Sequence, residues 1–215
     1  MMIMFLCSCS NETLYEKTID NVVEIICDGD INKSYGTGTI ISNDGLILTN
    51  RHVIESFDMK DIFIKFNNDE NMYNISIINK SDLYDLALIK VQRKTKCFKS
   101  FSTNVNVSDD VYSIGNSYGF GLSYYEGIIS SDYKNIINDN KSILALQTNI
   151  EIYDGASGGP LFNKKCELLG IMTFRINDRG NYVNGMSFAI PSKIILEYLE
   201  GIELWKNYLL DCCYF

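Results

Sequence analysis

The sequence predicts an all-β protein built as a pair of β-barrels. Short aliphatic and β-branched runs follow one another closely, and turns rich in Gly, Asn and Asp separate them. A polar, lysine-bearing segment at 93–104 divides two such series of strands. Short strands at this spacing favour barrels over an alternating α/β arrangement. A chain of 215 residues is long enough to bury a substantial core.

The first lobe is expected over about residues 14–95. Its clearest feature is a β-hairpin, in which the runs 36–41 and 46–49 flank the turn Asn43-Asp44-Gly45. A buried strand is expected at 22–27, before the turn Asp28-Gly29-Asp30. Further strands are predicted at 62–66, 73–78 and 85–91.

The second lobe is expected over about residues 105–191, followed by a helix at 192–209. Apolar residues recur at helical spacing from Ile194 to Trp205, and Ser192 is the expected N-cap. One further helical turn at most is expected, at 53–56. The strands of this lobe are predicted at 110–114, 123–130, 143–148, 161–163, 167–174 and 182–189.

Charge and composition exclude several classes of function. A net charge of −8 argues against a general binder of nucleic acid or anionic membranes, which needs clustered Lys and Arg. The lysines Lys94, Lys96 and Lys99 are interpreted as a solvated loop. The single histidine, His52, excludes any site with two histidine ligands, and no CxxC pair is present. We therefore expect neither a metal nor a cofactor.

Residues 1–13 are interpreted as the end of a bacterial lipoprotein signal. Leu6-Cys7-Ser8-Cys9 resembles a lipobox, with Cys9 as the acylated residue, although a basic n-region is missing and the apolar run is short. This interpretation predicts an exported protein of the cell envelope or periplasm with a lipid anchor at Cys9. The alternative is an apolar first strand in a cytoplasmic protein. No later segment approaches the ~20 apolar residues of a membrane span.

A glycine-rich stretch at 151–161 carries the strongest chemical signal. It places Ser157 among Gly155, Gly158 and Gly159, which tolerate positive φ angles and close approach to a substrate. The backbone N–H groups of Gly155 and Ser157 are candidates for an oxyanion hole. The alternative for this stretch alone is a glycine-rich surface turn.

Two upstream residues favour the chemical interpretation. His52 ends an apolar strand, and Asp85 lies directly against the strand that follows it. A carboxylate there needs a partner, which an imidazole N–H would supply. Asp82 is the rival, but it lies in a polar turn. His52, Asp85 and Ser157 therefore form a candidate base, orienting acid and nucleophile.

These motifs identify a resemblance to the trypsin-like (chymotrypsin-fold) serine proteases, and within them to the bacterial HtrA/Deg-type proteases. The similarity covers about residues 36–191. The matching segments are Gly36-Thr37-Gly38-Thr39-Ile40-Ile41, Leu48-Thr49-Asn50-Arg51-His52-Val53, Asp85-Leu86-Ala87-Leu88-Ile89-Lys90, Ser113-Ile114-Gly115-Asn116, Glu126-Gly127-Ile128-Ile129-Ser130, Gly155-Ala156-Ser157-Gly158-Gly159-Pro160-Leu161 and Gly185-Met186-Ser187-Phe188-Ala189-Ile190-Pro191.

The resemblance implies two six-stranded barrels within 14–215, with the active site between them. It assigns His52 as general base, Asp85 as its orienting acid and Ser157 as nucleophile. Two departures stand out. Deg-type proteases usually carry PDZ domains after the protease domain, whereas this sequence ends soon after Pro191; and Ala156 replaces a common Asn or Asp.

The resemblance also marks candidate substrate-binding residues. Glu151, six residues before the nucleophile, is expected at the base of the primary pocket. There it would favour a basic substrate residue, unless its side chain points to solvent. The strand at Thr173, Phe174 and Arg175 is expected to pair with the substrate backbone, and Phe174 or Arg175 to narrow the pocket.

The sequence thus predicts a serine endopeptidase that cleaves unfolded or flexible polypeptides through an acyl-enzyme. The rival hypothesis is a non-catalytic, chaperone-like binding module on the same fold. A cysteine hydrolase is excluded, because the nucleophile position holds Ser157. Polypeptides are the expected partners, and a homo-oligomer is a further expectation.

Overall fold

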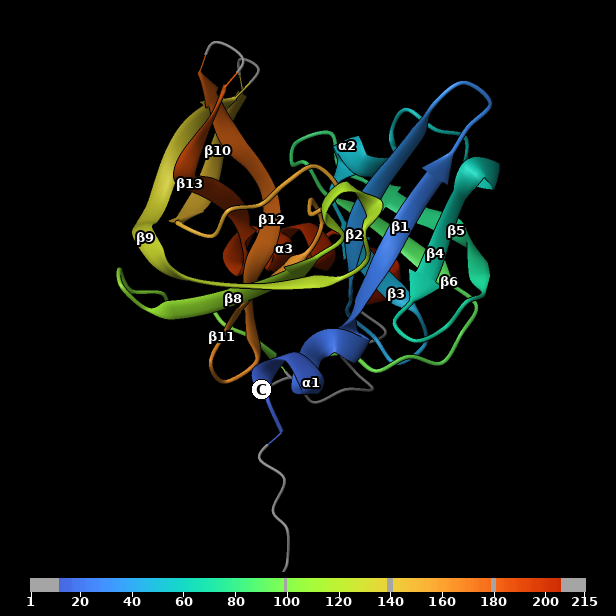
Figure 1. Cartoon of the computed structure of the whole chain (residues 1–215), viewed down its shortest axis with the longest axis horizontal. Helices are drawn as coiled ribbons and strands as arrows, with labels where there is room; N and C mark the ends of the chain where they lie inside the picture. Colours follow the sequence, from blue (N-terminus) through green and yellow to red (C-terminus); the bar gives the residue numbers. More distant parts are fainter. Residues whose placement is uncertain (1–11, 99, 139–140, 179–180, 206–215) are drawn as a thin grey trace, which may run out of the picture.

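The computed structural model describes residues 12–98, 100–138, 141–178 and 181–205. Figure 1 shows two lobes side by side, with β1–β6 on one side and β8–β13 on the other. The predicted lipid-anchor residue Cys9 and residues 206–209 of the predicted helix lie outside the described residues.

The first lobe is a closed six-stranded barrel in the order β1-β2-β3-β6-β5-β4. The predicted hairpin is confirmed, because Thr39 pairs with Leu48 and Ile40 with Ile47. Gly45 closes its turn at φ +95°, and a Cβ there would lie 2.2 Å from the Val91 carbonyl. The strands are Val22–Asp28 (β1), Lys33–Ile40 (β2), Leu46–Thr49 (β3), Ile62–Phe66 (β4), Met72–Lys80 (β5) and Ala87–Val91 (β6).

The second lobe is a sheet in the order β11-β8-β9-β10-β13-β12-β7. β11 also pairs with β12, so the six strands β8–β13 of this sheet form a closed ring. The short β7, parallel to β12, lies in the segment 93–104 for which only a connection was expected. The strands are Ser100–Phe101 (β7), Asp110–Gly115 (β8), Ser123–Asn138 (β9), Lys141–Thr148 (β10), Pro160–Asn163 (β11), Glu167–Asp178 (β12) and Asn181–Pro191 (β13).

The first helix was not predicted, although the sequence holds a signal for it. Thr13 and Glu16 form a reciprocal capping box at its start, the pattern Thr-x-x-Glu. None of the helices in the described ranges is long and apolar enough to cross a membrane. The helical elements are Leu14–Thr18 (α1), Ile19–Asn21 (η1), Arg51–Ile54 (α2), Met59–Asp61 (η2), Ser117–Gly119 (η3) and Ser192–Glu200 (α3).

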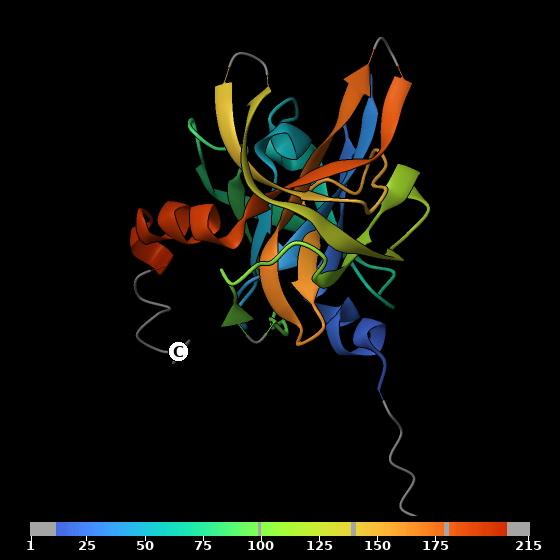
Figure 2. The same ribbon diagram turned by 90° about the vertical axis from the view of Figure 1, so that its left-hand side faces the viewer.

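The C-terminal helix α3 is shorter than predicted and is capped differently. It ends at Glu200, with Gly201 as its C-cap, although Trp205 beyond it is also buried. Pro191, not Ser192, is the N-cap, because the Ser192 hydroxyl donates to the Leu168 carbonyl instead. Figure 2 shows α3 projecting from one side of the second lobe. Its apolar face packs in a core cluster that contains residues of both lobes, among them Leu48 and Phe162.

One buried residue of the first lobe, Thr37 on β2, binds the serine loop of the second lobe, which we define as residues 153–159. Its N–H donates to the Ser157 carbonyl at 2.9 Å, and its hydroxyl donates to the Gly155 carbonyl at 2.7 Å. The same hydroxyl accepts from the Asn116 N–H at 2.9 Å. Thr37 is fully buried, so water cannot replace these bonds.

We therefore expect Thr37→Val to destabilise the protein by about 1–3 kcal/mol, because two buried backbone groups lose their partner. Thr37→Ser keeps the hydroxyl and is the matched control, with a smaller loss from the missing methyl group. Urea denaturation measures both. A valine variant as stable as the serine variant would show that these hydrogen bonds contribute little.

Candidate active site

The pairing of β3 with β6 brings His52 and Asp85 together. Thr49 lies opposite Ala87, so the residues just after β3 and just before β6 are neighbours. His52, in α2, approaches Asp85 with its Nδ1 at 2.6 Å from Oδ2. Its backbone N–H also donates to Oδ1 at 2.9 Å. The rival Asp82 has a fully exposed side chain and pairs with Arg51 instead.

Asp85 has two further partners, which fix its orientation. The Thr173 hydroxyl from β12 donates to Oδ2 at 2.8 Å, and the Asn50 amide donates to the Asp85 carbonyl at 2.9 Å. The sequence predicted Thr173 only as part of a substrate-binding strand. Its bond to Asp85 spans the two lobes, and no local sequence signal indicates it.

The two titratable groups shift each other's pKa in opposite directions. Desolvation lowers the pKa of His52, but the hydrogen bond and charge of Asp85 outweigh it and raise that pKa above 6.5. Desolvation raises the pKa of Asp85, yet the bonds from His52 and Thr173 hold it below its ordinary 3.8. Both shifts favour an ionised carboxylate beside an imidazole that is a stronger base than usual.

Ser157 lies beside this pair but is hydrogen-bonded elsewhere. Its Oγ donates to the Thr173 carbonyl at 3.1 Å, and within the described ranges no hydrogen bond joins it to His52. Ser157 and His52 nevertheless line two cavities together. The serine hydroxyl therefore rests on the Thr173 carbonyl, and hydrogen bonds between catalytic groups are often unformed without substrate.

Two backbone N–H groups of the serine loop, those of Gly155 and Ser157, are the candidates for an oxyanion hole. The Asp154 carbonyl accepts from the Tyr118 N–H at 2.6 Å. In a trans peptide the N–H of Gly155 must point the opposite way, away from Tyr118. Across the described residues, neither this N–H nor that of Ser157 donates to another protein group. Gly155 adopts φ +97°, which strongly favours glycine here.

The predicted pocket residues separate into two groups. Glu151 is exposed, accepts from the Tyr153 hydroxyl at 3.0 Å and does not line the cavities beside Ser157. Thr173, Phe174 and Arg175 do line the cavity that contains Ser157 and His52. The structure thus directs the Glu151 side chain to solvent, which was the alternative left open by the sequence.

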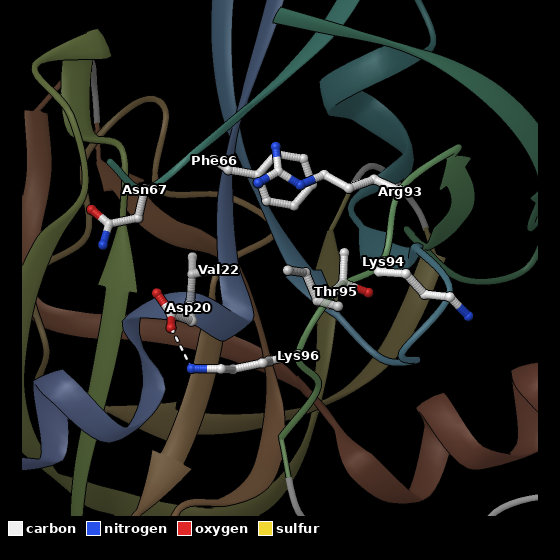
Figure 3. Close-up of a pocket in the computed structure, with 9 residues that line it drawn as sticks. Asp20, Val22, Phe66, Asn67, Arg93, Lys94, Thr95 and Lys96 are labelled. Atoms are coloured by element: carbon white, nitrogen blue, oxygen red, sulfur yellow. Dashed lines mark hydrogen bonds and ion pairs between the residues drawn. The ribbon is translucent and has the colours of Figure 1, made fainter. Parts of the chain in front are cut away.

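A separate cavity in the first lobe is lined by residues that include Phe66, Arg93 and Lys96. Figure 3 shows the Arg93 guanidinium over the Phe66 ring, at 4.3 Å from its centroid, and Lys96 paired with Asp20. Arg93 also pairs with Asp69. Within the described ranges, no group of three or more His, Cys, Asp and Glu side chains is placed to hold a metal ion.

Comparison with known proteins identifies the family of this chain. Residues 36–171 match the model of the trypsin-like peptidase domain. The chain belongs to the trypsin-like peptidase family. Among relatives of this family, it is 36% identical over 171 residues to the serine endoprotease DegS of Haemophilus influenzae, covering 78% of this chain and 49% of DegS. It is 34% identical over 172 residues to a probable periplasmic serine endoprotease, DegP-like, of a Marinomonas species, covering 79% and 36%.

Solved structures show the same trypsin-like fold. The serine endoprotease from Yersinia pestis matches with a TM-score of 0.74 at 29% identity, over 87% of this chain and 64% of that one. The HtrA-type protease AlgW with a tripeptide matches with a TM-score of 0.80 at 27% identity, over 87% and 62%. This chain therefore spans about half or less of the length of these curated relatives.

Because His52 is the only histidine, its titration can be followed without assignment. We expect its imidazole proton resonance to report a pKa above 6.5 in the wild-type protein. Asp85→Asn removes the charge and leaves the desolvation, so the pKa should fall below 6.5.

Asp82→Asn is the matched control, since Asp82 is exposed and does not contact His52. It should leave the titration nearly unchanged. An Asp85→Asn protein that titrates like the wild type would contradict the pairing of Asp85 with His52.

Proposed function

We propose that this chain is a serine endopeptidase acting on unfolded or flexible polypeptides. The observation that carries the proposal is the Asp85–His52 pair beside Ser157, at a loop with two N–H groups free to bind an oxyanion. Family membership supports the same reaction. Relatives named as serine endoproteases support peptide bonds as the substrate.

In the proposed mechanism, Ser157 leaves the Thr173 carbonyl and turns toward His52. The imidazole takes its proton while Oγ attacks the scissile carbonyl carbon. The N–H groups of Gly155 and Ser157 bind the negative oxygen, a contribution typically worth about 10²–10³ in rate per donor. His52 then protonates the leaving amine. In the second half of the reaction, His52 takes a proton from water, which attacks the acyl-enzyme, and then returns a proton to the Ser157 Oγ as the acid product leaves.

One observation favours a second function, that of a non-catalytic peptide-binding module. Ser157 donates to Thr173 rather than to His52, as would suit a non-catalytic peptide-binding module. Against it, such a module has no need for Asp85 to be held by three donors from His52 and Thr173. The catalytic proposal accounts for both the acid and its partners.

We expect a fluorophosphonate probe to label the wild-type protein and Ser157→Ala to lose both labelling and turnover of an unfolded protein substrate. The variant should keep its thermal stability within about 1 kcal/mol. Ser123→Ala is the control, because Ser123 is exposed at the start of β9. Wild-type protein that neither labels nor cleaves, with or without unfolded substrate, would favour the binding module.

For location, we propose the cell envelope, because relatives are named periplasmic. The lipid anchor at Cys9 remains part of this proposal. Cys9→Ser should release the protein from the membrane fraction. A variant that still sediments with membranes would exclude acylation of Cys9 as the anchor.

A further inference from the structure

Arg175 lies between two tyrosine rings at the edge of the catalytic cavity. Its guanidinium carbon is 3.4 Å from the centroid of the Tyr182 ring and 4.7 Å from that of Tyr153. Arg175 belongs to β12, Tyr182 to β13 and Tyr153 to the serine loop. Stacking between rings restricts the faces of the guanidinium and leaves its edge, with the N–H donors, for a ligand.

The charge of Arg175 is not matched by an acid among the side chains that the structure describes. Two acids of the serine loop region, Glu151 and Asp154, accept hydrogen bonds from the two tyrosines instead. The Tyr153 hydroxyl donates to Glu151 at 3.0 Å, and that of Tyr182 donates to Asp154 at 3.3 Å. Asp154 also lines the cavity, but it is exposed, so solvent screens its charge more than that of the half-buried Arg175.

The position of Arg175 relative to Ser157 defines which substrate residue it meets. One cavity of about 230 Å³ contains Ser157, His52 and Arg175. Consider a substrate whose scissile carbonyl lies at the N–H groups of Gly155 and Ser157 and whose preceding residues pair with β12 from Thr173. Such a substrate places one side chain in this cavity. That side chain belongs to the residue on the amino side of the cleaved bond.

We propose that Arg175 selects substrates with Glu or Asp immediately before the cleaved bond. This inference rests on the proposed peptidase function and adds its specificity. A carboxylate is the ligand that the planar guanidinium fork binds best, through two parallel hydrogen bonds. It must come from a side chain, because a free C-terminal carboxylate would lie on the other side of the bond.

The test compares fluorogenic peptides that differ only in the residue before the cleaved bond, which is Glu, Gln, Val or Lys. We expect kcat/KM for the Glu peptide to exceed that for the Gln peptide by about tenfold or more, as expected for a charge-assisted hydrogen bond. Arg175→Gln should bring the ratio of the two close to one. Arg175→Glu should make Lys the preferred residue.

A control variant separates local recognition from other effects. Lys164→Gln removes a cation that pairs with Asp110 at an exposed position, and it should keep the Glu preference. Melting curves identify any variant that fails to fold, and Arg175→Lys is then used, since it retains the charge without the planar fork.

Equal kcat/KM for the Glu and Gln peptides in the wild-type protein would overturn the proposal. So would an Arg175→Gln variant that slows all peptides equally, which indicates a structural role. Peptidyl phosphonates carrying Glu or Gln provide a readout without turnover, because they inactivate Ser157 directly. Failure of Ser157 to react with any phosphonate would instead contradict the peptidase function itself.

Discussion

The hydrogen bonds of Thr37 are the constraint on which the active-site arrangement depends. Through one N–H and one hydroxyl, this residue of the first barrel binds the carbonyls of Ser157 and Gly155 in the second lobe. The Thr37 carbonyl in turn accepts from the Thr49 hydroxyl on β3, three residues before His52. The elements that carry His52 and Ser157 are therefore joined through one buried residue.

This arrangement explains why a glycine follows Ser157. Gly158 adopts φ +90°, and a Cβ there would lie 2.0 Å from the Thr37 carbonyl. Any larger residue would push the serine loop away from β2. The glycines of the loop thus serve two purposes, since Gly155 orients an N–H group while Gly158 allows close contact between the lobes.

Thr173 makes the second connection across the cleft. Its hydroxyl donates to Asp85 from the first lobe, while its carbonyl accepts from Ser157. Movement of β12 would therefore change the orientation of Asp85 and the rotamer of Ser157 together. Arg175, two residues further along the same strand, couples this element to the serine loop through Tyr153. With a net charge of −8 on the whole chain, attraction of an acidic substrate by Arg175 would act only at short range.

Much of the fold could be read from local patterns. The hairpin around Asn43-Asp44-Gly45 and the strand Ile62–Phe66 follow from alternation and turn residues, which act within a few positions. The capping box at Thr13 is also a local signal, and it marks helix α1, which was not among the predicted elements. The spacing of short strands predicted a second barrel, but its six strands were implied only by the family resemblance, and its closure through β11 and β12 depends on strand order, which is not a local property.

By itself, the sequence determined most of the strands, the order of His52, Asp85 and Ser157, and the resemblance to the trypsin-like family. The tertiary structure decided the rest of the site: the outward direction of Glu151, the position of Arg175 between two tyrosines and the rotamer of Ser157. The physical reason is separation along the chain. Thr173 is 88 residues from Asp85, and Thr37 is 118 from Gly155, so each contact exists only once the two lobes have packed.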